Sequence, residues 1–330
     1  MQYRKLGSTD IEVSAVAFGC WAIVGGFNWG PQDEADSLAA LRAAYDAGVT
    51  FFDSAEIYGD GYSEQLVGKA LGDVRDSIVI ASKVSADHFA PADLREACER
   101  SLHNLGTDRI DLYQLHWPSR EIPVAETLGV LAELEAEGKI RACGVSNFGP
   151  RDLAECLATG RPIANNQLAY NMLFRAIEFE ILPTCVREGI GVLCYSPMLQ
   201  GLLTGKFASA DDVPVDRART RHFACTRRDA RHSEPGAEAE TFAAIAGIRQ
   251  VAAELGQPMA NVALAWLLAQ EGVTSVLAGG RNPEQARANA GAGDLVLPDD
   301  AIARLSAVAE PLKVKLGANA DMWQTESRIR

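Results

Sequence analysis

Residues 78–116, IVIASKVSADHFAPADLREACERSLHNLGTDRIDLYQLH, decide the fold. The stretch opens with a short apolar run that ends at Lys83 and closes with a second apolar run that ends at His116. Parallel strands are buried on both faces, so their bodies read as continuously apolar. The segment between them has apolar residues at helical spacing, namely Leu94, Cys98, Leu102 and Leu105. The stretch therefore predicts a strand, a helix and a second parallel strand.

The same alternation extends over the whole chain in both directions from this unit. Strands are predicted at 15–19, 50–53, 78–83, 110–115, 140–145, 164–168, 191–195 and 273–278. Helices are predicted at 34–47, 63–71, 92–105, 124–137, 150–159, 178–188, 239–255, 259–270, 283–290 and 299–310. This α/β pattern favours a (β/α)8 TIM barrel. An open dinucleotide-binding sheet usually carries a G-x-G-x-x-G turn, which the sequence lacks.

Three additions to a plain barrel are expected. The opening YRKLGSTDIEVS, residues 3–14, predicts a hairpin that covers the closed end. The two helices at 239–255 and 259–270 and the long loop at 198–238 follow strand seven. A barrel needs roughly 250 residues, and 330 accommodate one barrel with insertions. No boundary is evident, so residues 1–330 are predicted to form a single domain.

The long loop is unusual in its charge. It contains two histidines and six arginines, which are Arg217, Arg219, Arg221, Arg227, Arg228 and Arg231. One interpretation is a solvated and mobile run of charge. The other is a flexible belt that folds over a phosphate-bearing ligand. Both remain open from the sequence.

Composition excludes several classes of protein. The net charge of −13 argues against a nucleic-acid partner, which requires a basic face. The seven cysteines are an odd number without a C-x-x-C pair, which indicates a reducing compartment and no disulfide framework. No apolar run approaches the roughly 20 residues of a membrane span. We expect a cytoplasmic protein with no membrane partner and no metal site.

Polar residues at or just beyond the ends of successive strands suggest one active site at the mouth of the barrel. Lys83 ends an apolar strand, so its ammonium needs a partner, and Asp53 ends the neighbouring strand. A lysine beside the phenol of Tyr58 is expected to lower the tyrosine pKa from about 10. Such a phenol can protonate a developing alkoxide, while His116 orients the carbonyl oxygen.

Each of these four residues also has an ordinary structural explanation. Asp53 can cap a loop, Lys83 can extend its amine from a strand end to solvent, and His116 can belong to a turn. Tyr58 is uninformative alone. The arrangement is specific only as a set, because the four residues follow three neighbouring strands.

At this point the sequence resembles the aldo-keto reductase superfamily, in its bacterial sugar or aldehyde reductase and potassium-channel β-subunit branches. The resemblance rests on FDSAEIYG (52–59), IASK (80–83), LYQLHWP (112–118), GVSNF (144–148), NQLAYN (166–171) and YSPMLQGLLTGK (195–206). These segments occur in the family's order and extend over essentially the whole chain. The family fold is a (β/α)8 barrel that binds NAD(P)H without an open dinucleotide-binding sheet.

The resemblance assigns roles to individual residues. It makes Tyr58 the general acid, with Asp53, Lys83 and His116 in support. It implies that the cofactor is bound by Ser146, Asn147, Gln167, Tyr195, Ser196, Leu199, Gly201, Lys206, Gly279, Arg281, Gln285 and Asn289. Among these, the amide and hydroxyl groups of the first three suit the nicotinamide carboxamide, and Tyr195 is the plate on which the ring stacks. Gly201 and Gly205 are also consistent with simple turn geometry.

One departure affects the choice of cofactor. Many relatives have a lysine at the position of Gly279 and an arginine at that of Gln285, and both contact the 2′-phosphate of NADP. Here Arg281 supplies the nearby charge. NADP(H) is therefore expected, because a guanidinium suits a phosphate, and NAD(H) stays open.

The expected function is the reversible NAD(P)H-dependent reduction of an aldehyde, ketone or sugar. The substrate pocket is expected to include Trp21, Phe27, Trp29, Trp117 and the carboxy-terminal segment. Three alternatives remain. They are a sugar dehydrogenase working oxidatively, a cofactor-binding regulatory barrel like a potassium-channel β-subunit, and an open α/β binding protein without catalysis. The sequence leaves open whether the protein forms a homo-oligomer.

Overall fold

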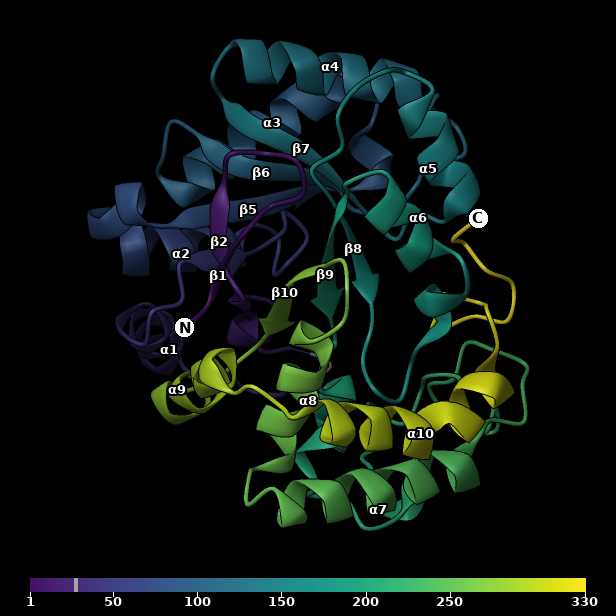
Figure 1. Cartoon of the computed structure of the whole chain (residues 1–330). Helices are drawn as coiled ribbons and strands as arrows, with labels where there is room; N and C mark the ends of the chain where they lie inside the picture. Colours follow the sequence, from purple (N-terminus) through teal and green to yellow (C-terminus); the bar gives the residue numbers. More distant parts are fainter. Residues whose placement is uncertain (27–28) are drawn as a thin grey trace.

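The computed structural model describes residues 1–26 and 29–330, and its centre is a closed barrel of parallel strands (Figure 1). Around the barrel the strands are ordered β10, β3, β4, β5, β6, β7, β8 and β9. They are β3 (Val16–Gly19), β4 (Phe51–Asp53), β5 (Val79–Val84), β6 (Ile110–Leu115), β7 (Ile140–Ser146), β8 (Asn165–Ala169), β9 (Gly191–Tyr195) and β10 (Val273–Ala278). The predicted (β/α)8 barrel is confirmed.

Helices surround the barrel, as the alternation predicts (Figure 1). They are α1 (Glu34–Asp46), α2 (Tyr62–Leu71), α3 (Pro91–Leu105), α4 (Val124–Ala136), α5 (Pro150–Leu157), α6 (Ile181–Arg187), α7 (Glu238–Glu254), α8 (Met259–Leu268), α9 (Pro283–Ala290) and α10 (Asp299–Leu316). The long loop after β9 contains two 3₁₀ turns, η5 (Leu199–Thr204) and η6 (Ala210–Asp212). Among the described helices, none combines the length and apolar character needed to cross a membrane.

Helix α3 shows how local sequence sets the bounds of these elements. Pro91 occupies the first helical position, where a backbone N–H is not required. Gly106 ends the helix in the left-handed conformation with φ of 63°. The residues at helical spacing, Leu94, Cys98, Leu102 and Leu105, are all buried against the barrel. The prediction for this unit is therefore confirmed to within one residue.

Helix α10 extends beyond its predicted end at residue 310. It continues through Pro311 to Leu316, although proline removes one backbone hydrogen bond. Leu312 and Leu316 lie on the buried side of the extra turns and are 1% and 6% exposed. Burial of these two side chains offsets the lost hydrogen bond, and a purely local reading of the proline misses this tertiary contribution.

The amino-terminal hairpin of β1 (Tyr3–Lys5) and β2 (Glu12–Ser14) covers the end of the barrel at which the strands begin. Leu6, Ile11 and Val13 join the apolar cluster inside the barrel. Gly7 has φ of 53°, and a Cβ there would lie 2.2 Å from the carbonyl oxygen of Ala164. Only glycine allows this close approach, so the hairpin is fixed against the strand ends.

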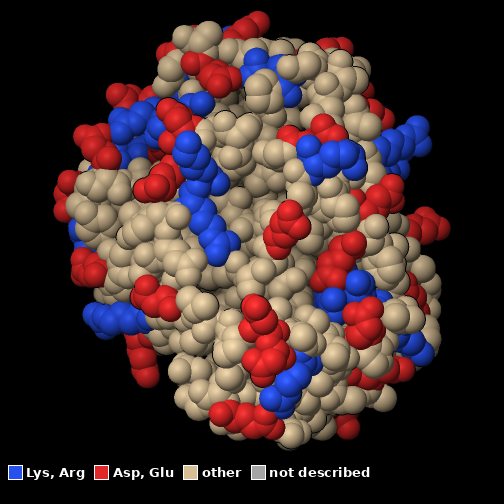
Figure 2. Space-filling model, in the orientation of Figure 1, with Lys and Arg blue, Asp and Glu red and all other residues tan. Residues whose placement is uncertain are grey.

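The surface of the same face carries both signs of charge (Figure 2). Acidic and basic side chains are interspersed there among neutral residues. Within the described residues all seven cysteines are free, and only Cys225 among them is exposed. The open end of the barrel, opposite the hairpin, is where the sequence places its candidate site.

Candidate active site

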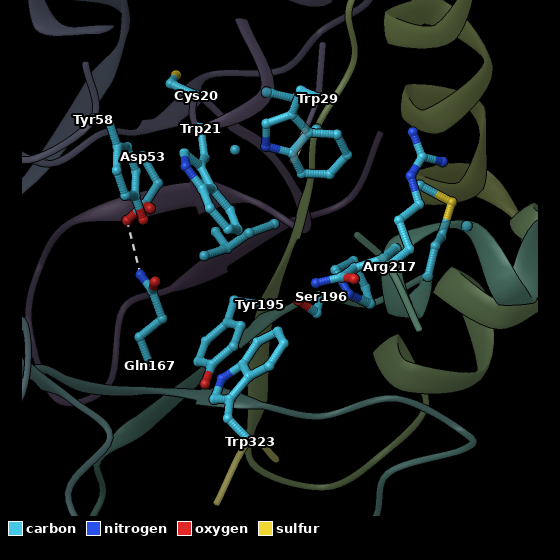
Figure 3. A pocket seen from close by; sticks show the side chains of 18 of the residues that line it. Cys20, Trp21, Trp29, Asp53, Tyr58, Gln167, Tyr195, Ser196, Arg217 and Trp323 are labelled. Atoms are coloured by element: carbon cyan, nitrogen blue, oxygen red, sulfur yellow. Dashed lines mark hydrogen bonds between the residues drawn. The ribbon is translucent and has the colours of Figure 1, made fainter. Parts of the chain in front are cut away.

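A cavity of about 940 Å³ opens at the carboxyl ends of the barrel strands (Figure 3). Most of the predicted catalytic and cofactor residues line it, although they come from distant parts of the chain. Those that do so are Asp53, Tyr58, His116, Ser146, Asn147, Gln167, Tyr195, Ser196, Gly201, Lys206, Gly279, Arg281, Gln285 and Asn289. Lys83 lies behind this lining with no exposed surface, and the side chain of Leu199 is buried in the core.

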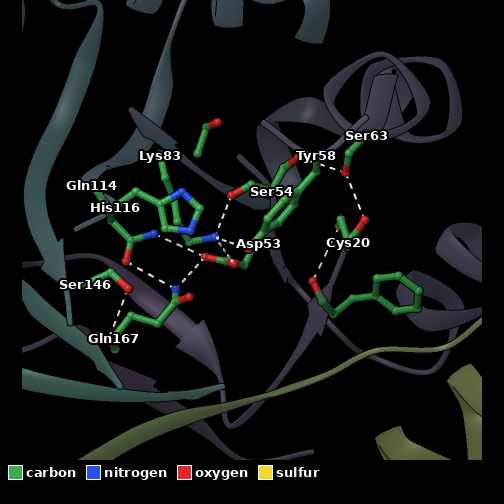
Figure 4. A network of polar contacts seen from close by, with 12 residues as sticks. Cys20, Asp53, Ser54, Tyr58, Ser63, Lys83, Gln114, His116, Ser146 and Gln167 are labelled. Carbon is green, nitrogen blue, oxygen red and sulfur yellow. Dashed lines mark hydrogen bonds and ion pairs between the residues drawn. The ribbon is translucent and has the colours of Figure 1, made fainter. Parts of the chain in front are cut away.

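The buried lysine of the site is held by neighbouring strands (Figure 4). Lys83 Nζ lies 2.5 Å from Asp53 Oδ1 and donates to the Ser54 carbonyl oxygen at 2.7 Å. It also donates to Tyr58 Oη at 3.3 Å. Burial opposes the charge on Lys83, but Asp53 and Tyr58 raise its pKa above the ordinary value. The lysine is therefore an ammonium at neutral pH.

The second carboxylate oxygen of Asp53 accepts two amide hydrogen bonds. Gln167 Nε2 donates to Asp53 Oδ2 at 2.8 Å, and Gln114 Nε2 donates to the same oxygen at 3.1 Å. Asn165 Nδ2 in turn donates to Gln114 Oε1 at 2.8 Å. Gln114 is absent from the sequence prediction. The alternation of side chains along a strand could have identified it. Gln114 in β6 lies two residues before His116, which directly follows the strand, so the two side chains are expected on the same side.

The sequence analysis expected the Tyr58 pKa to be lowered, and this prediction is wrong, because the Tyr58 pKa is raised. Burial raises the pKa of this phenol, the Lys83 ammonium lowers it, and the Asp53 carboxylate raises it again. The sum places the Tyr58 pKa above its ordinary value. The sequence argument considered the cation alone, whereas the cation is paired with a carboxylate and the phenol is buried. The phenol thus keeps its proton at neutral pH, which suits a proton donor.

The imidazole of His116 faces the same phenol. The two rings meet edge to face with centroids 5.9 Å apart. Burial and the nearby Lys83 charge lower the pKa of His116 to about 3. The ring is therefore neutral at physiological pH and can donate one hydrogen bond. Its Nδ1 is buried and has no hydrogen-bond partner in the part of the chain that the structure describes.

The predicted carboxamide-binding residues form a connected group. Asn147 Nδ2 donates to the His116 carbonyl oxygen and to Ser146 Oγ, both at 3.1 Å. Tyr195 Oη donates to Asn147 Oδ1 at 2.9 Å. Both N–H groups of the Gln167 amide are used, toward Asp53 and toward Gln114. The side-chain oxygen of Gln167 therefore remains available to accept a hydrogen bond from an amide N–H group.

The loop after β9 is backbone-strained where it borders the cavity. Ser196, Leu199 and Gln200 have φ of 51°, 41° and 52°, in the region that L-residues rarely adopt. Gly201 follows with φ of 100°. Such conformations cost free energy and concentrate at ligand-binding segments. Lys206 ends this strained segment, and burial together with the Arg217 charge lowers the Lys206 pKa.

The far end of the cavity is built by the segment between β10 and α9. Asn289 Nδ2 donates to the Gly279 carbonyl oxygen at 3.0 Å, and Gln285 Oε1 accepts from the Arg281 backbone N–H at 3.0 Å. The Arg281 guanidinium donates through Nε to Gln32 Oε1 at 2.7 Å and through a second nitrogen to the Pro31 carbonyl oxygen. These contacts hold its charge at the rim of the cavity.

Aromatic side chains form the wall next to Tyr58 (Figure 3). The Trp21 ring stacks on Tyr58 with centroids 6.1 Å apart and meets Trp29 edge to face at 5.6 Å. Trp117 also lines the cavity and lies under the guanidinium of Arg328 at 3.9 Å. The expected pocket residue Phe27 lies outside the described residues.

The arginine-rich loop divides into two groups. Arg221, Arg227 and Arg228 are in ion pairs with carboxylates. Arg217, Arg219 and Arg231 line the cavity, together with Trp323 of the carboxy-terminal segment. The sequence analysis predicted no specific contact for these three arginines or for Trp323. Packing between distant parts of the chain brings them to the site, and the local sequence carries no signal of it. Within the described residues, no group of His, Cys, Asp and Glu is arranged to hold a metal ion.

The chain is similar to known proteins over most of its length. The profile of the Aldo/keto reductase family matches residues 15–310. The chain is 36% identical over 299 residues to the aldo-keto reductase YhdN of Bacillus subtilis, covering 87% of each protein. It is 33% identical over 340 residues to the NADH-specific methylglyoxal reductase of Escherichia coli, covering 95% of this chain and all of the relative.

A solved structure is similar over nearly the same extent. The aldo-keto reductase from Klebsiella pneumoniae in complex with NADPH matches with a TM-score of 0.74 and 30% identity, covering 94% of this chain and 96% of the other. Residues 15–310, which the family profile matches, include Asp53, Tyr58, Lys83 and His116. This chain therefore belongs to the aldo/keto reductase family of oxidoreductases.

Proposed function

We propose that the protein reduces the carbonyl group of a small aldehyde or ketone with a nicotinamide cofactor, and that Tyr58 donates the proton. The observation that carries this proposal is the Lys83 ammonium, fully buried and shared between Asp53 Oδ1 and Tyr58 Oη. A buried cation next to a phenol serves a reaction in which negative charge develops on a nearby oxygen. Reduction of a carbonyl group is such a reaction.

The side chains divide the work on the carbonyl oxygen. Tyr58 holds its proton at neutral pH and gives it to the oxygen as negative charge develops there. The ammonium of Lys83 then stabilises the phenolate that remains. His116, neutral and facing the Tyr58 ring, donates a hydrogen bond that orients the oxygen. Asp53 keeps the lysine in place, and Gln114 and Gln167 keep Asp53 in place.

The cavity fits a dinucleotide in size and in chemistry. Its roughly 940 Å³ extend from Tyr58 to the segment at Gly279 and Asn289. We infer that the Gln167 oxygen accepts from the carboxamide and that the strained loop from Ser196 to Lys206 lies along the phosphates. When bound, the nicotinamide supplies the hydride. We infer that the Tyr195 ring stacks on the nicotinamide and leaves only its other face open to the substrate.

Two observations bear on the choice between the nicotinamide cofactors. Arg281 places a guanidinium at the far end of the cavity, where it suits a 2′-phosphate. That guanidinium is already bonded to Gln32 and Pro31, which reduces the number of N–H groups free for a ligand. One similar structure contains NADPH and one relative is NADH-specific. We propose NADPH as the preferred cofactor, with NADH accepted.

The test removes only the phenol oxygen. Tyr58→Phe keeps the ring that stacks on Trp21 and should lower kcat by about 10²- to 10⁴-fold, the usual contribution of a positioned proton donor. The matched control is Tyr62→Phe, since Tyr62 Oη bonds Glu34 at 2.6 Å outside the cavity. The measurement is NADPH and NADH oxidation with a panel of aldehydes and ketones. Retention of most of the turnover by Tyr58→Phe contradicts the assignment.

A further inference from the structure

Three arginines line the cavity without a carboxylate to neutralise them. Within the described residues, neither Arg217, Arg219 nor Arg231 has an acidic group at ion-pair distance, although the protein as a whole has a net charge of −13. The Nε atoms of Arg217 and Arg219 are buried and have no hydrogen-bond acceptor in that same part of the chain. Buried guanidinium N–H groups are costly unless something accepts from them.

Aromatic rings, in place of carboxylates, position two of these arginines. The Arg217 guanidinium lies over Trp29 at 5.9 Å, and the Arg219 guanidinium lies over Trp323 at 4.9 Å. Trp323 lies beside Tyr195 on the same wall of the cavity (Figure 3). A ring face attracts the cation without using its N–H groups, so the terminal N–H groups stay available to a ligand.

The two arginines contact different side chains of the cavity wall. A Cβ added to Gly201 would lie 3.0 Å from Lys206 Nζ and 3.8 Å from a terminal nitrogen of Arg217. The Arg217 guanidinium thus lies near the strained segment from Ser196 to Lys206, which is proposed to contact the cofactor phosphates. Arg219 instead lies over Trp323, which borders Tyr195.

Arg219 is accompanied by a second cation. Burial lowers the pKa of Arg219 and the neighbouring Arg231 charge lowers it further, and together they outweigh the opposite effect of the more distant carboxylates of Asp229 and Asp216. Two like charges brought together at a half-buried site repel each other, and an anion between them would relieve this repulsion.

The other charges of the cavity largely cancel. Asp53 is paired with Lys83, and Asp229 bonds Arg228. Arg328 is bonded at 2.6 and 3.1 Å to the two carboxylate oxygens of the fully buried Asp321. Among the described residues that line the cavity, Arg219 and Arg231 are therefore guanidinium groups without a carboxylate at ion-pair distance.

From this arrangement we propose that Arg219 and Arg231 bind an anionic group of the substrate, so that the preferred substrate is an aldehyde or ketone carrying a carboxylate or phosphate. This inference rests on the proposed carbonyl reduction and specifies its substrate class. The planar guanidinium of Arg219 offers paired N–H donors that match either anion.

The test compares matched substrates that differ in charge. Succinic semialdehyde is compared with butanal for the carboxylate, and glyceraldehyde 3-phosphate with glyceraldehyde for the phosphate. The measured quantity is the ratio of kcat/KM for the anionic member to kcat/KM for the neutral member. For at least one pair the unmodified enzyme should give a ratio of about 10 or more, since a charge-assisted hydrogen bond contributes about that factor. The pair that shows the effect identifies the anion.

Two substitutions and a control locate the effect. Arg219→Gln should lower the ratio about 10-fold or more, and Arg219→Lys should restore part of it because the charge is kept. Arg231→Gln should lower the ratio as well, and its exposed position favours normal folding. The control is Arg151→Gln in α5, where Arg151 is 70% exposed and outside the cavity. It removes the same charge and should leave the ratio unchanged.

The outcomes separate the inference from the function beneath it. A ratio near or below 1 for both pairs, with neutral aldehydes reduced, overturns the inference and leaves carbonyl reduction intact. A drop in NADPH affinity in Arg219→Gln, with the ratio unchanged, also overturns it, because the arginine then serves the cofactor. An enzyme that reduces neither member of either pair contradicts the proposed function and the inference together.

Discussion

The buried ion pair between Lys83 and Asp53 makes a prediction that separates folding from catalysis. Replacing Lys83 with methionine preserves the unbranched shape of the side chain and removes its charge. The change leaves the Asp53 carboxylate, which is 2% exposed, without its cation. The remaining partners of that carboxylate are the amides of Gln114 and Gln167.

The size of the effect follows from the burial of both partners. Breaking a buried ion pair on one side typically costs about 3–5 kcal/mol, because the other charge stays buried and uncompensated. The double variant Lys83→Met/Asp53→Asn removes both charges and keeps an oxygen that can accept from Gln167. It should regain about 2 kcal/mol or more of the lost stability. Its turnover should remain reduced about 10²-fold, since the cation beside Tyr58 is still missing.

The assay combines urea unfolding, followed by tryptophan fluorescence, with NADPH oxidation. Lys69→Met is the matched control, because Lys69 is paired with Glu34 at the surface and 61% of its side chain is exposed. The control should unfold at nearly the same urea concentration as the unmodified protein. Equal stability of Lys83→Met and the unmodified protein would refute the argument from buried charge. A double variant as unstable as the single one would refute it too.

Three other predictions concern the pH dependence of turnover, the pH dependence of stability and the choice of cofactor. Because the Tyr58 pKa is raised and a proton donor must be protonated, kcat/KM for reduction should hold through neutral pH and fall only above about pH 10; a fall centred near neutrality would contradict this. The folded protein has a His116 pKa lowered to about 3, whereas the unfolded chain binds a proton at this residue below about pH 6.5. The free energy of unfolding should therefore decrease as the pH drops below about 6.5. The decrease should be smaller in His116→Gln, which lacks the imidazole. Arg281→Ala should lower the preference for NADPH over NADH about 10-fold in kcat/KM, and an unchanged preference would place the 2′-phosphate elsewhere.

The barrel could be predicted because its signals are local and repeated. Each strand body reads as an apolar run and each helix as a periodic segment, so β5, α3 and β6 follow directly from residues 78–116. The end of α10 could not be predicted in this way. Pro311 signals a stop, and only the burial of Leu312 and Leu316 in the folded chain explains why the helix continues.

The site could be predicted as a set of residues, but its electrostatics could not. Position at strand ends identified Asp53, Lys83 and His116. The direction of the Tyr58 pKa depends on how deeply the phenol is buried and on how closely Asp53 offsets the lysine. Gln114 was not predicted because it stands within an apolar run, and its hydrogen bond to Asp53 on another strand is visible only in the folded chain.

The two kinds of residue in the cavity differ in how tightly the fold constrains them. Asp53 and Lys83 are held by strands and by each other, so a change at either one disturbs folding as well as chemistry. Arg219 and Trp323 come from the loop after β9 and from the carboxy-terminal segment, and they meet through one cation–π contact. Such a contact contributes about 0.5–2 kcal/mol, so replacing it should leave the barrel folded. A change at Arg219 should therefore alter the proposed preference for charged substrates without disturbing the proposed proton-donating group at the strand ends.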